Sequence, residues 1–135
     1  MSLQVLEGAG LPPRLARRAR HVVTEEGRAK DAAIALRRRD LDAVGPLMTA
    51  SHRSMQHDFE ISTPDLDNVV AAALDAGAAG ARLTGGGFGG TAIILVRTPD
   101  ISAVIEAVRD VLATPSRPRP EIAAVRAVEG ARRVG

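Results

Sequence analysis

The chain has 135 residues, of which 45% are hydrophobic and 25% charged, so it is long enough for one globular domain with its own core. It contains no cysteine, which excludes disulfide scaffolds, cysteine zinc sites and thiol catalysis. No apolar run approaches the roughly 18 residues of a membrane span, and the N-terminus does not resemble a signal peptide. We therefore expect a cytoplasmic protein without a membrane partner.

The net charge is only +2, because 18 basic residues face 16 acidic ones. Arginines gather at 14–20, 37–39 and 132–133, and we expect them on solvated helix faces, an interaction patch being the alternative. So small a net charge is a weak argument for nucleic-acid binding, and two aromatic residues, Phe59 and Phe88, are too few to stack bases. The sequence predicts no nucleic-acid partner.

Two helices are expected first. Leu11-Pro12-Pro13 is a typical helix entry, and apolar residues recur at helical spacing after it, which predicts a helix over 13–38 with Gly27 as a weak point. Asp40 is a good N-cap for a second helix, but Gly45-Pro46 interrupts its pattern. We therefore expect a kink or a short leading turn there, with the main helix over 46–57. The apolar pattern of the first helix consists of Leu15, Ala19, Val22, Val23, Ala33 and Leu36.

A third helix has the clearest start in the chain. Ser62 or Thr63 can cap it, Pro64 suits its first turn, and Gly77 is the expected stop. Two acids in the first turn complement the helix dipole. Its apolar stripe consists of Leu66, Val69, Val70, Ala73 and Leu74.

The rest of the chain predicts strands around one more helix. Strands are expected over 78–83, 91–97 and 122–128. The branched apolar residues of 91–97 indicate a buried strand. Between the last two, Pro99-Asp100 opens a helix that ends in the Pro-rich loop 114–120. Its apolar face consists of Ile101, Val104, Ile105, Val108 and Leu112, and a tail follows at 130–135.

This order predicts an α+β fold. Tightly joined strands imply an antiparallel hairpin, and helices would stack on one face of a small antiparallel sheet. We expect a two-layer sandwich preceded by two to three helices, forming one domain over residues 1–135. Residues 1–10 are expected to be poorly ordered or a remnant of a preceding domain.

A glycine-rich loop joins the two strands of the expected hairpin. Five of the seven residues from Thr84 to Gly90 are glycine, which implies close backbone approach or positive φ angles. The exposed N–H groups of such a loop can form a nest for phosphate, and a flexible hairpin tip is the alternative. The residues of this loop are Thr84, Gly85, Gly86, Gly87, Phe88, Gly89 and Gly90.

Three known phosphate loops do not fit it. A dinucleotide-binding loop leads into a helix, whereas 91–97 forms a strand. There is no Gly-Lys-Ser/Thr of a Walker A loop, and the following strand ends in Arg97 without the lysine of a protein kinase.

Other candidate residues are weak. His52 and His57 are five residues apart, and this spacing does not place them on one helix face for a metal. We expect surface or capping roles for these two histidines and for His21. Asp65 and Asp67 are explained by the helix N-terminus without catalysis. The sequence therefore predicts no catalytic residue and no metal ligand in this chain.

Several segments together resemble one enzyme family. Thr84-Gly-Gly-Gly-Phe-Gly-Gly90 looks like the third motif of the GHMP small-molecule kinases in its galactokinase form. Four further stretches look like galactokinase segments and occur in the family's order. They are Arg18-Ala-Arg-His-Val-Val-Thr-Glu25, Ser51-His-Arg-Ser54 with Asp58-Phe-Glu-Ile-Ser62, Asp65-Leu-Asp67, and Gly130-Ala-Arg-Arg-Val134. The sequence thus resembles the C-terminal domain of galactokinases over residues 10 to 134.

The resemblance implies a ferredoxin-like fold and ATP- and Mg²⁺-dependent phosphorylation of the C1 hydroxyl of α-D-galactose. The residues carried over from the family are Thr84 to Gly90, as a loop that positions the phosphate region with its backbone. The family's N-terminal domain, with its sugar contacts, second phosphate loop, catalytic aspartate and transition-state arginine, has no counterpart in the 135 residues.

Two interpretations follow. As the C-terminal part of a galactokinase, the chain alone is expected to be inactive, to bind no cofactor and to self-associate through the apolar face left by the missing domain. The alternative is a stand-alone, non-catalytic module that binds a ligand or protein, or pairs in trans with a separate N-terminal half.

Overall fold

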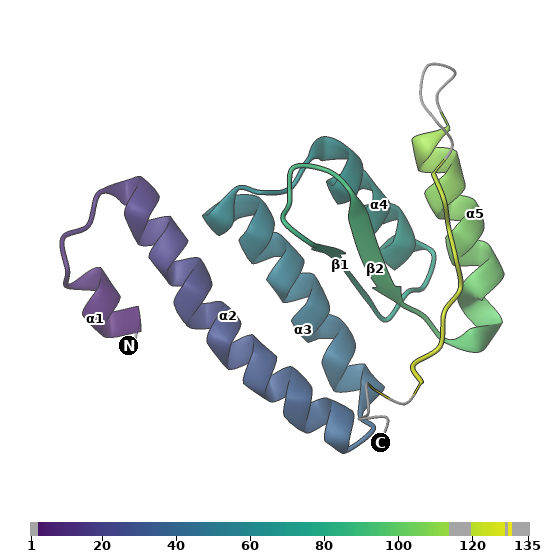
Figure 1. Cartoon of the computed structure of the whole chain (residues 1–135), viewed down its shortest axis with the longest axis horizontal. Helices are drawn as coiled ribbons and strands as arrows, with labels where there is room; N and C mark the ends of the chain where they lie inside the picture. The colour runs from purple at the N-terminus through teal and green to yellow at the C-terminus, as the bar shows by residue number, and fades with distance from the viewer. Residues whose placement is uncertain (1–2, 114–119, 129, 131–135) are drawn as a thin grey trace, which may run out of the picture.

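The computed structural model describes residues 3–113, 120–128 and 130. Within these residues, five α-helices and a two-stranded antiparallel sheet form an α+β fold, as predicted (Figure 1). The elements are α1 (Leu3–Glu7), α2 (Pro13–Arg37), α3 (Leu41–Ser54), a π-helical turn (Met55–Phe59), α4 (Pro64–Asp75), β1 (Gly80–Thr84), β2 (Thr91–Leu95), a 3₁₀ turn (Thr98–Asp100) and α5 (Ile101–Leu112).

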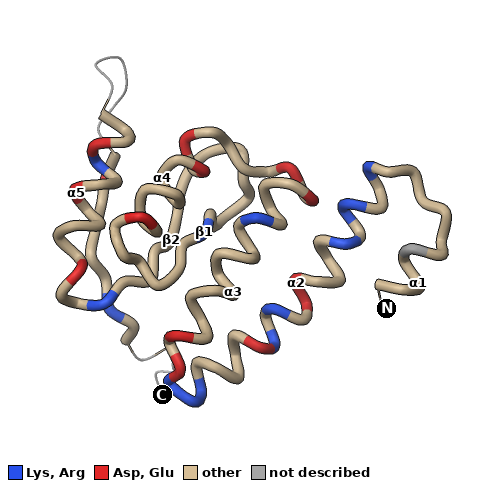
Figure 2. The backbone as a smooth tube through the Cα atoms, turned by 180° about the vertical axis from the view of Figure 1, so that it is seen from behind, with Lys and Arg blue, Asp and Glu red and all other residues tan. Residues whose placement is uncertain are grey.

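Helices α2 and α3 run side by side at one edge of the molecule (Figures 1 and 2). Helix α2 follows the predicted range closely and continues through Gly27. Short helix α1, within residues 1–10, contacts α2, and the origin of these residues in a preceding domain stays a prediction.

The interruption expected at Gly45-Pro46 is wrong. Helix α3 starts directly after Asp40, whose side chain accepts a hydrogen bond from Ala43 N at 3.0 Å, and it continues through Pro46 to Ser54. Pro46 lies in the second turn, so the helix loses a single backbone hydrogen bond there. The glycine has another function, because a Cβ on Gly45 would lie 1.9 Å from the carbonyl oxygen of Ala79, just before β1.

Helix α4 begins and ends as its local sequence predicts. Thr63 Oγ1 accepts a hydrogen bond from Leu66 N at 3.4 Å, Pro64 is the first helical residue, and Gly77 has a φ of 97° after the last turn. Its apolar stripe faces inward, with Val69, Val70 and Ala73 buried.

The hairpin is also confirmed. Strands β1 and β2 pair antiparallel, from Gly80 opposite Leu95 to Thr84 opposite Thr91. However, β2 is not a fully buried strand: Ile94 packs against the core, whereas Ile93 on the opposite face is 46% exposed. A continuous apolar run is buried on both faces only when both faces of the sheet are covered.

The predicted strand over 122–128 is wrong. Residues 120–128 have no strand pairing, and past Ile122, which packs against the core, they are exposed. Strand propensity needs cross-strand and packing partners to take effect, and among residues 120–128 no strand partner is present and Ile122 alone packs against the core. The segments at 114–119 and 131–135 lie outside the described residues, and with them most of the predicted Pro-rich loop and tail.

The apolar core lies between the hairpin and helices α4 and α5. Helix α4 crosses behind the hairpin, and α5 packs against α4 (Figure 1). Two buried clusters form it: Val69, Val70, Ala73, Ala81, Val104 and Val108 in one, and Met55, Ile61, Leu66 and Leu83 in the other.

Helix α2 contributes no side chain to these clusters. The large members of the apolar pattern seen in its sequence are mostly exposed, with Leu15 at 54%, Val22 at 60% and Leu36 at 55%, whereas Ala19, Val23 and Ala33 are half-buried. Arg18 and Arg28, expected on a solvated face, instead pack partly buried against other elements, with 23% and 18% of their side chains exposed. The polar side of α2 is therefore the side that contacts the rest of the chain.

Candidate functional site

The glycine loop joins β1 to β2 at one end of the hairpin. Five of its residues between the strands have positive φ, from 58° at Phe88 to 124° at Gly89. Four of these five are glycines, which explains the glycine content, since side chains disfavour this conformation. A strand follows the loop, so the exclusion of a dinucleotide-binding loop is confirmed.

The middle of the loop is attached to the segment that precedes α4. Phe88 N donates a hydrogen bond to the carbonyl oxygen of Ile61 at 2.7 Å, and a Cβ on Gly87 would lie 2.6 Å from Ile61 Cβ. Ile61 is itself buried, so the loop is fixed to the core at this point. The loop is thus held by tertiary contacts and is more than a free hairpin tip.

The remaining loop glycines face open space. A Cβ added at Gly85, Gly86, Gly89 or Gly90 would meet no atom within 4 Å. A ligand could therefore approach the loop backbone closely on this side.

A buried histidine connects three elements next to the loop. His52 of α3 is 3% exposed, and its Nδ1 accepts a hydrogen bond from Leu83 N at 3.2 Å, on the strand that leads into the loop. The neutral ring therefore carries its proton on Nε2, which lies 3.1 Å from Asp67 Oδ1 of α4 but is not aligned with it as a hydrogen bond. Burial lowers the pKa of His52, although the Asp67 carboxylate opposes this effect.

Asp67 is held by two further donors. Ser62 Oγ donates to its Oδ1 at 2.6 Å, and Gln56 Nε2 donates to its Oδ2 at 2.8 Å. With both oxygens accepting hydrogen bonds, this carboxylate links α4 to the segments that precede it.

A second polar group links α2, α3 and β1. Glu25 Oε1 accepts a hydrogen bond from Ser51 Oγ at 2.7 Å and lies 3.7 Å from Arg82 Nη1. Arg28 adds an ion pair to the same carboxylate at 3.2 Å. Glu25 therefore connects the polar side of α2 to the strand that precedes the glycine loop.

A third polar group lies between α2 and the π-helical turn. The ring of His21 stacks on Phe59 with centroids 4.6 Å apart, and its Nδ1 lies 3.0 Å from Ser54 Oγ, which donates to Asp58 Oδ2. Burial is the main cause that lowers the pKa of His21. Arg18 donates to the carbonyl oxygen of Asp58 and lies over the Phe59 ring.

The expectation of surface histidines is wrong for His21 and His52, which are 8% and 3% exposed, whereas His57 is exposed. The sequence held a signal for His52. It follows Val44 and Met48 at i+8 and i+4, and so shares the apolar face of its helix.

These polar groups unite the segments that carried the family resemblance. The segments 51–54, 58–62 and 65–67 follow one another closely, whereas 18–25 is distant from them in sequence, and together they contact one another and β1. The structure thereby explains why these polar residues occur together: they fix the strand and the loop relative to three helices.

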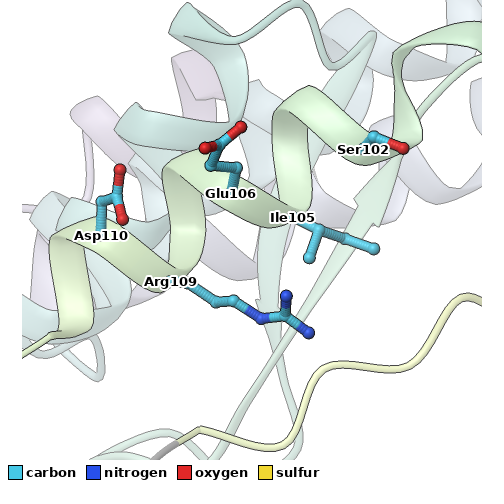
Figure 3. A pocket seen from close by; sticks show the side chains of 5 residues that line it. All are labelled: Ser102, Ile105, Glu106, Arg109 and Asp110. Carbon is cyan, nitrogen blue, oxygen red and sulfur yellow. The ribbon is translucent and has the colours of Figure 1, made fainter.

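The described residues contain no other arrangement with an evident chemical role. Among them, no three His, Asp or Glu side chains gather to hold a metal ion, and no helix is long and apolar enough to cross a bilayer. A shallow cavity of about 410 Å³ lies on α5, apart from the glycine loop (Figure 3). Its lining residues are Ser102, Ile105, Glu106, Arg109 and Asp110.

The chain belongs to the GHMP kinase family: the model of "GHMP kinases C terminal" matches residues 32–114. Within that class it is similar to galactokinases. It is 43% identical to the galactokinase of Streptomyces coelicolor over 129 residues, and 46% identical to that of Mycobacterium tuberculosis H37Rv over 124 residues. These matches cover 96% and 92% of this chain but 33% and 34% of the relatives, so the chain spans about a third of their length.

Solved structures agree with this classification. The chain superposes on Lactococcus lactis galactokinase complexed with galactose with a TM-score of 0.77, at 38% identity, covering 82% of this chain and 30% of that one. Mevalonate kinase from L. major in complex with R-mevalonate gives a TM-score of 0.58 at 27% identity, and the match covers 62% of this chain and 26% of that one. The predicted resemblance to the C-terminal domain of GHMP kinases is confirmed.

Proposed function

We propose that this chain is the C-terminal part of a galactokinase, which transfers a phosphoryl group from ATP to the C1 hydroxyl of α-D-galactose. The observation that carries the proposal is identity of 43% and 46% with galactokinases over nearly the whole chain. The galactose complex of the similar Lactococcus lactis enzyme supports galactose as the substrate. The chain spans a third of these relatives, so the complete activity requires residues beyond these 135.

In this proposal Thr84 to Gly90 position the phosphate region with backbone groups. Phosphoryl transfer depends mainly on positioning and on electrostatic stabilisation, so a loop can contribute without a titrating side chain. Support comes from the contact of the loop with Ile61 and from the open space around four of its glycines. One part of the loop is fixed while another remains accessible to a ligand.

Mg²⁺ does not fit a site within the described residues, which offer no cluster of three His, Asp or Glu side chains. We therefore assign the ligands of the ion to parts of the enzyme outside this chain. The same holds for the catalytic groups, since Asp67, Glu25 and Asp58 are all engaged in structural contacts. The isolated chain should accordingly be inactive.

The test is a pair of assays for galactose 1-phosphate with ATP, Mg²⁺ and galactose. The isolated chain should give none. A chimera in which this chain replaces the matching third of the Streptomyces coelicolor galactokinase should turn over galactose. An active isolated chain would contradict the proposed division of the enzyme. A folded but inactive chimera would favour the stand-alone, non-catalytic module.

A further inference from the structure

Helix α2 is oriented with its polar side toward the rest of the chain. Arg18, His21 and Glu25 make its contacts with α3 and the π-helical turn, through hydrogen bonds, ion pairs and ring stacking. Only His21 and Ala35 are buried in this 25-residue helix. A surface helix normally buries its apolar side. With this orientation, large apolar side chains of α2 stay exposed within the part of the chain that the structure describes, although α1 packs against the helix.

The outward side carries a regular apolar row, which we call the α2 stripe: Leu15, Val22, Ala29 and Leu36. These residues recur every seven positions, so they lie along one side of the helix over about 32 Å. The three large side chains are 54%, 60% and 55% exposed. Apart from α1, no described element lies beyond this side of α2 (Figure 1). An apolar surface of this length marks an interaction site.

We propose that the α2 stripe is the surface on which the remaining part of a galactokinase chain docks, through an apolar face of its own. This inference rests on the proposed function. The similar galactokinases are about three times as long as the region that they share with this chain, so they contain a part large enough to cover the whole helix. Since α2 already contacts α3 through its polar side, it would lie between the two parts of the enzyme.

A second copy of this chain fits the stripe less well. An antiparallel two-fold pair of stripes would be centred between Val22 and Ala29. Glu26 lies there on the same side of the helix, in an exposed ion pair with Lys30 at 2.7 Å. The Glu26–Lys30 ion pairs of the two copies would be taken out of water near the two-fold axis, and the cost of desolvating these charges disfavours association.

Site-specific labelling tests the proposal, because the chain has no cysteine of its own. Val22→Cys places a thiol on the stripe. Asp31→Cys, nine residues or about two and a half turns further along, places a matched thiol on the opposite exposed side of α2. Maleimide labelling rates are compared between the isolated chain and the Streptomyces coelicolor chimera, with the chimera lacking either substitution as background. We expect Val22→Cys to react at least tenfold more slowly in the chimera, and Asp31→Cys to react equally in both.

Equal labelling of Val22→Cys in the isolated chain and in a folded chimera would overturn the proposal. So would protection in the isolated chain that disappears on dilution, since a second copy would then cover the stripe. Formation of galactose 1-phosphate by the chimera is a separate readout. Protection without activity contradicts the proposed function alone, and activity without protection contradicts the docking surface alone.

A measurement on the isolated chain keeps the inference testable even if the chimera does not fold. Val22→Gln and Leu36→Gln should leave the urea midpoint of the isolated chain nearly unchanged, because each side chain is more than half exposed in it. A lowered midpoint would show that the stripe is covered inside the chain itself, and would overturn the proposal.

Discussion

Gly45→Ala and Gly27→Ala are the same substitution inside two helices, with opposite expected results. Gly27 lies in α2, and a Cβ there meets no atom within 4 Å. Replacing it should stabilise the chain by about 0.5–1 kcal/mol, because alanine loses less backbone entropy on folding. Gly45 lies in α3, where a Cβ would be 1.9 Å from Ala79 O and 2.5 Å from Ala79 C.

The contact at Gly45 is with backbone, so no side chain can rotate away. Ordinary contact begins near 3.4 Å, and α3 and the start of β1 would have to separate by about 1.5 Å. Overpacking of this kind costs about 1–3 kcal/mol, which exceeds the helix-propensity gain. We expect Gly45→Ala to be less stable than the wild type by roughly 1–2 kcal/mol.

Urea unfolding followed by circular dichroism measures both variants. Gly27→Ala is the matched control, since the effect of alanine on the unfolded chain is common to both. A Gly45→Ala midpoint equal to or above that of Gly27→Ala would refute the close approach of α3 to β1.

Three further outcomes are expected. A Cβ at Gly87 would lie 2.6 Å from Ile61, on a residue with a φ of 82°. Gly87→Ala should therefore lower the formation of galactose 1-phosphate by the chimera at least tenfold. Wild-type activity would show that the loop can move without loss of function. Thr63→Ala should lower the unfolding free energy by about 0.5–2 kcal/mol in urea titrations, because it removes a helix cap, and an unchanged midpoint would argue against the cap. His21 and His52 have lowered pKa values in the folded chain, whereas histidines of the unfolded chain titrate near 6.5. Below pH 6.5 the unfolded chain therefore binds more protons than the folded one, and the free energy of unfolding should fall as the pH decreases. His52→Gln should flatten this dependence below pH 6.5, and an identical slope would contradict the contribution of that ring.

Local sequence signals determined the parts of the fold that depend on neighbouring residues. The cap at Thr63, the first-turn Pro64 and the stop at Gly77 define α4 correctly, because each acts within one helical turn. The hairpin and its positive-φ loop follow from two apolar runs around five glycines. The family resemblance was also readable, since it rests on the order of short motifs.

Partners distant in sequence decided the rest. Gly45 reads locally as an interruption, yet its lack of a side chain lets α3 approach Gly80 of β1. Residues 122–128 have strand composition but no partner strand. The two buried histidines required polar partners from other elements, which no local pattern identifies.

Helix α2 separates the two kinds of information most clearly. Its periodicity correctly predicted a helix and an apolar side, because periodicity reports which residues share a side. Periodicity does not report which side meets the rest of the chain. That choice was made by Arg18, His21 and Glu25, whose partners on α3, the π-helical turn and β1 come together only in the folded structure.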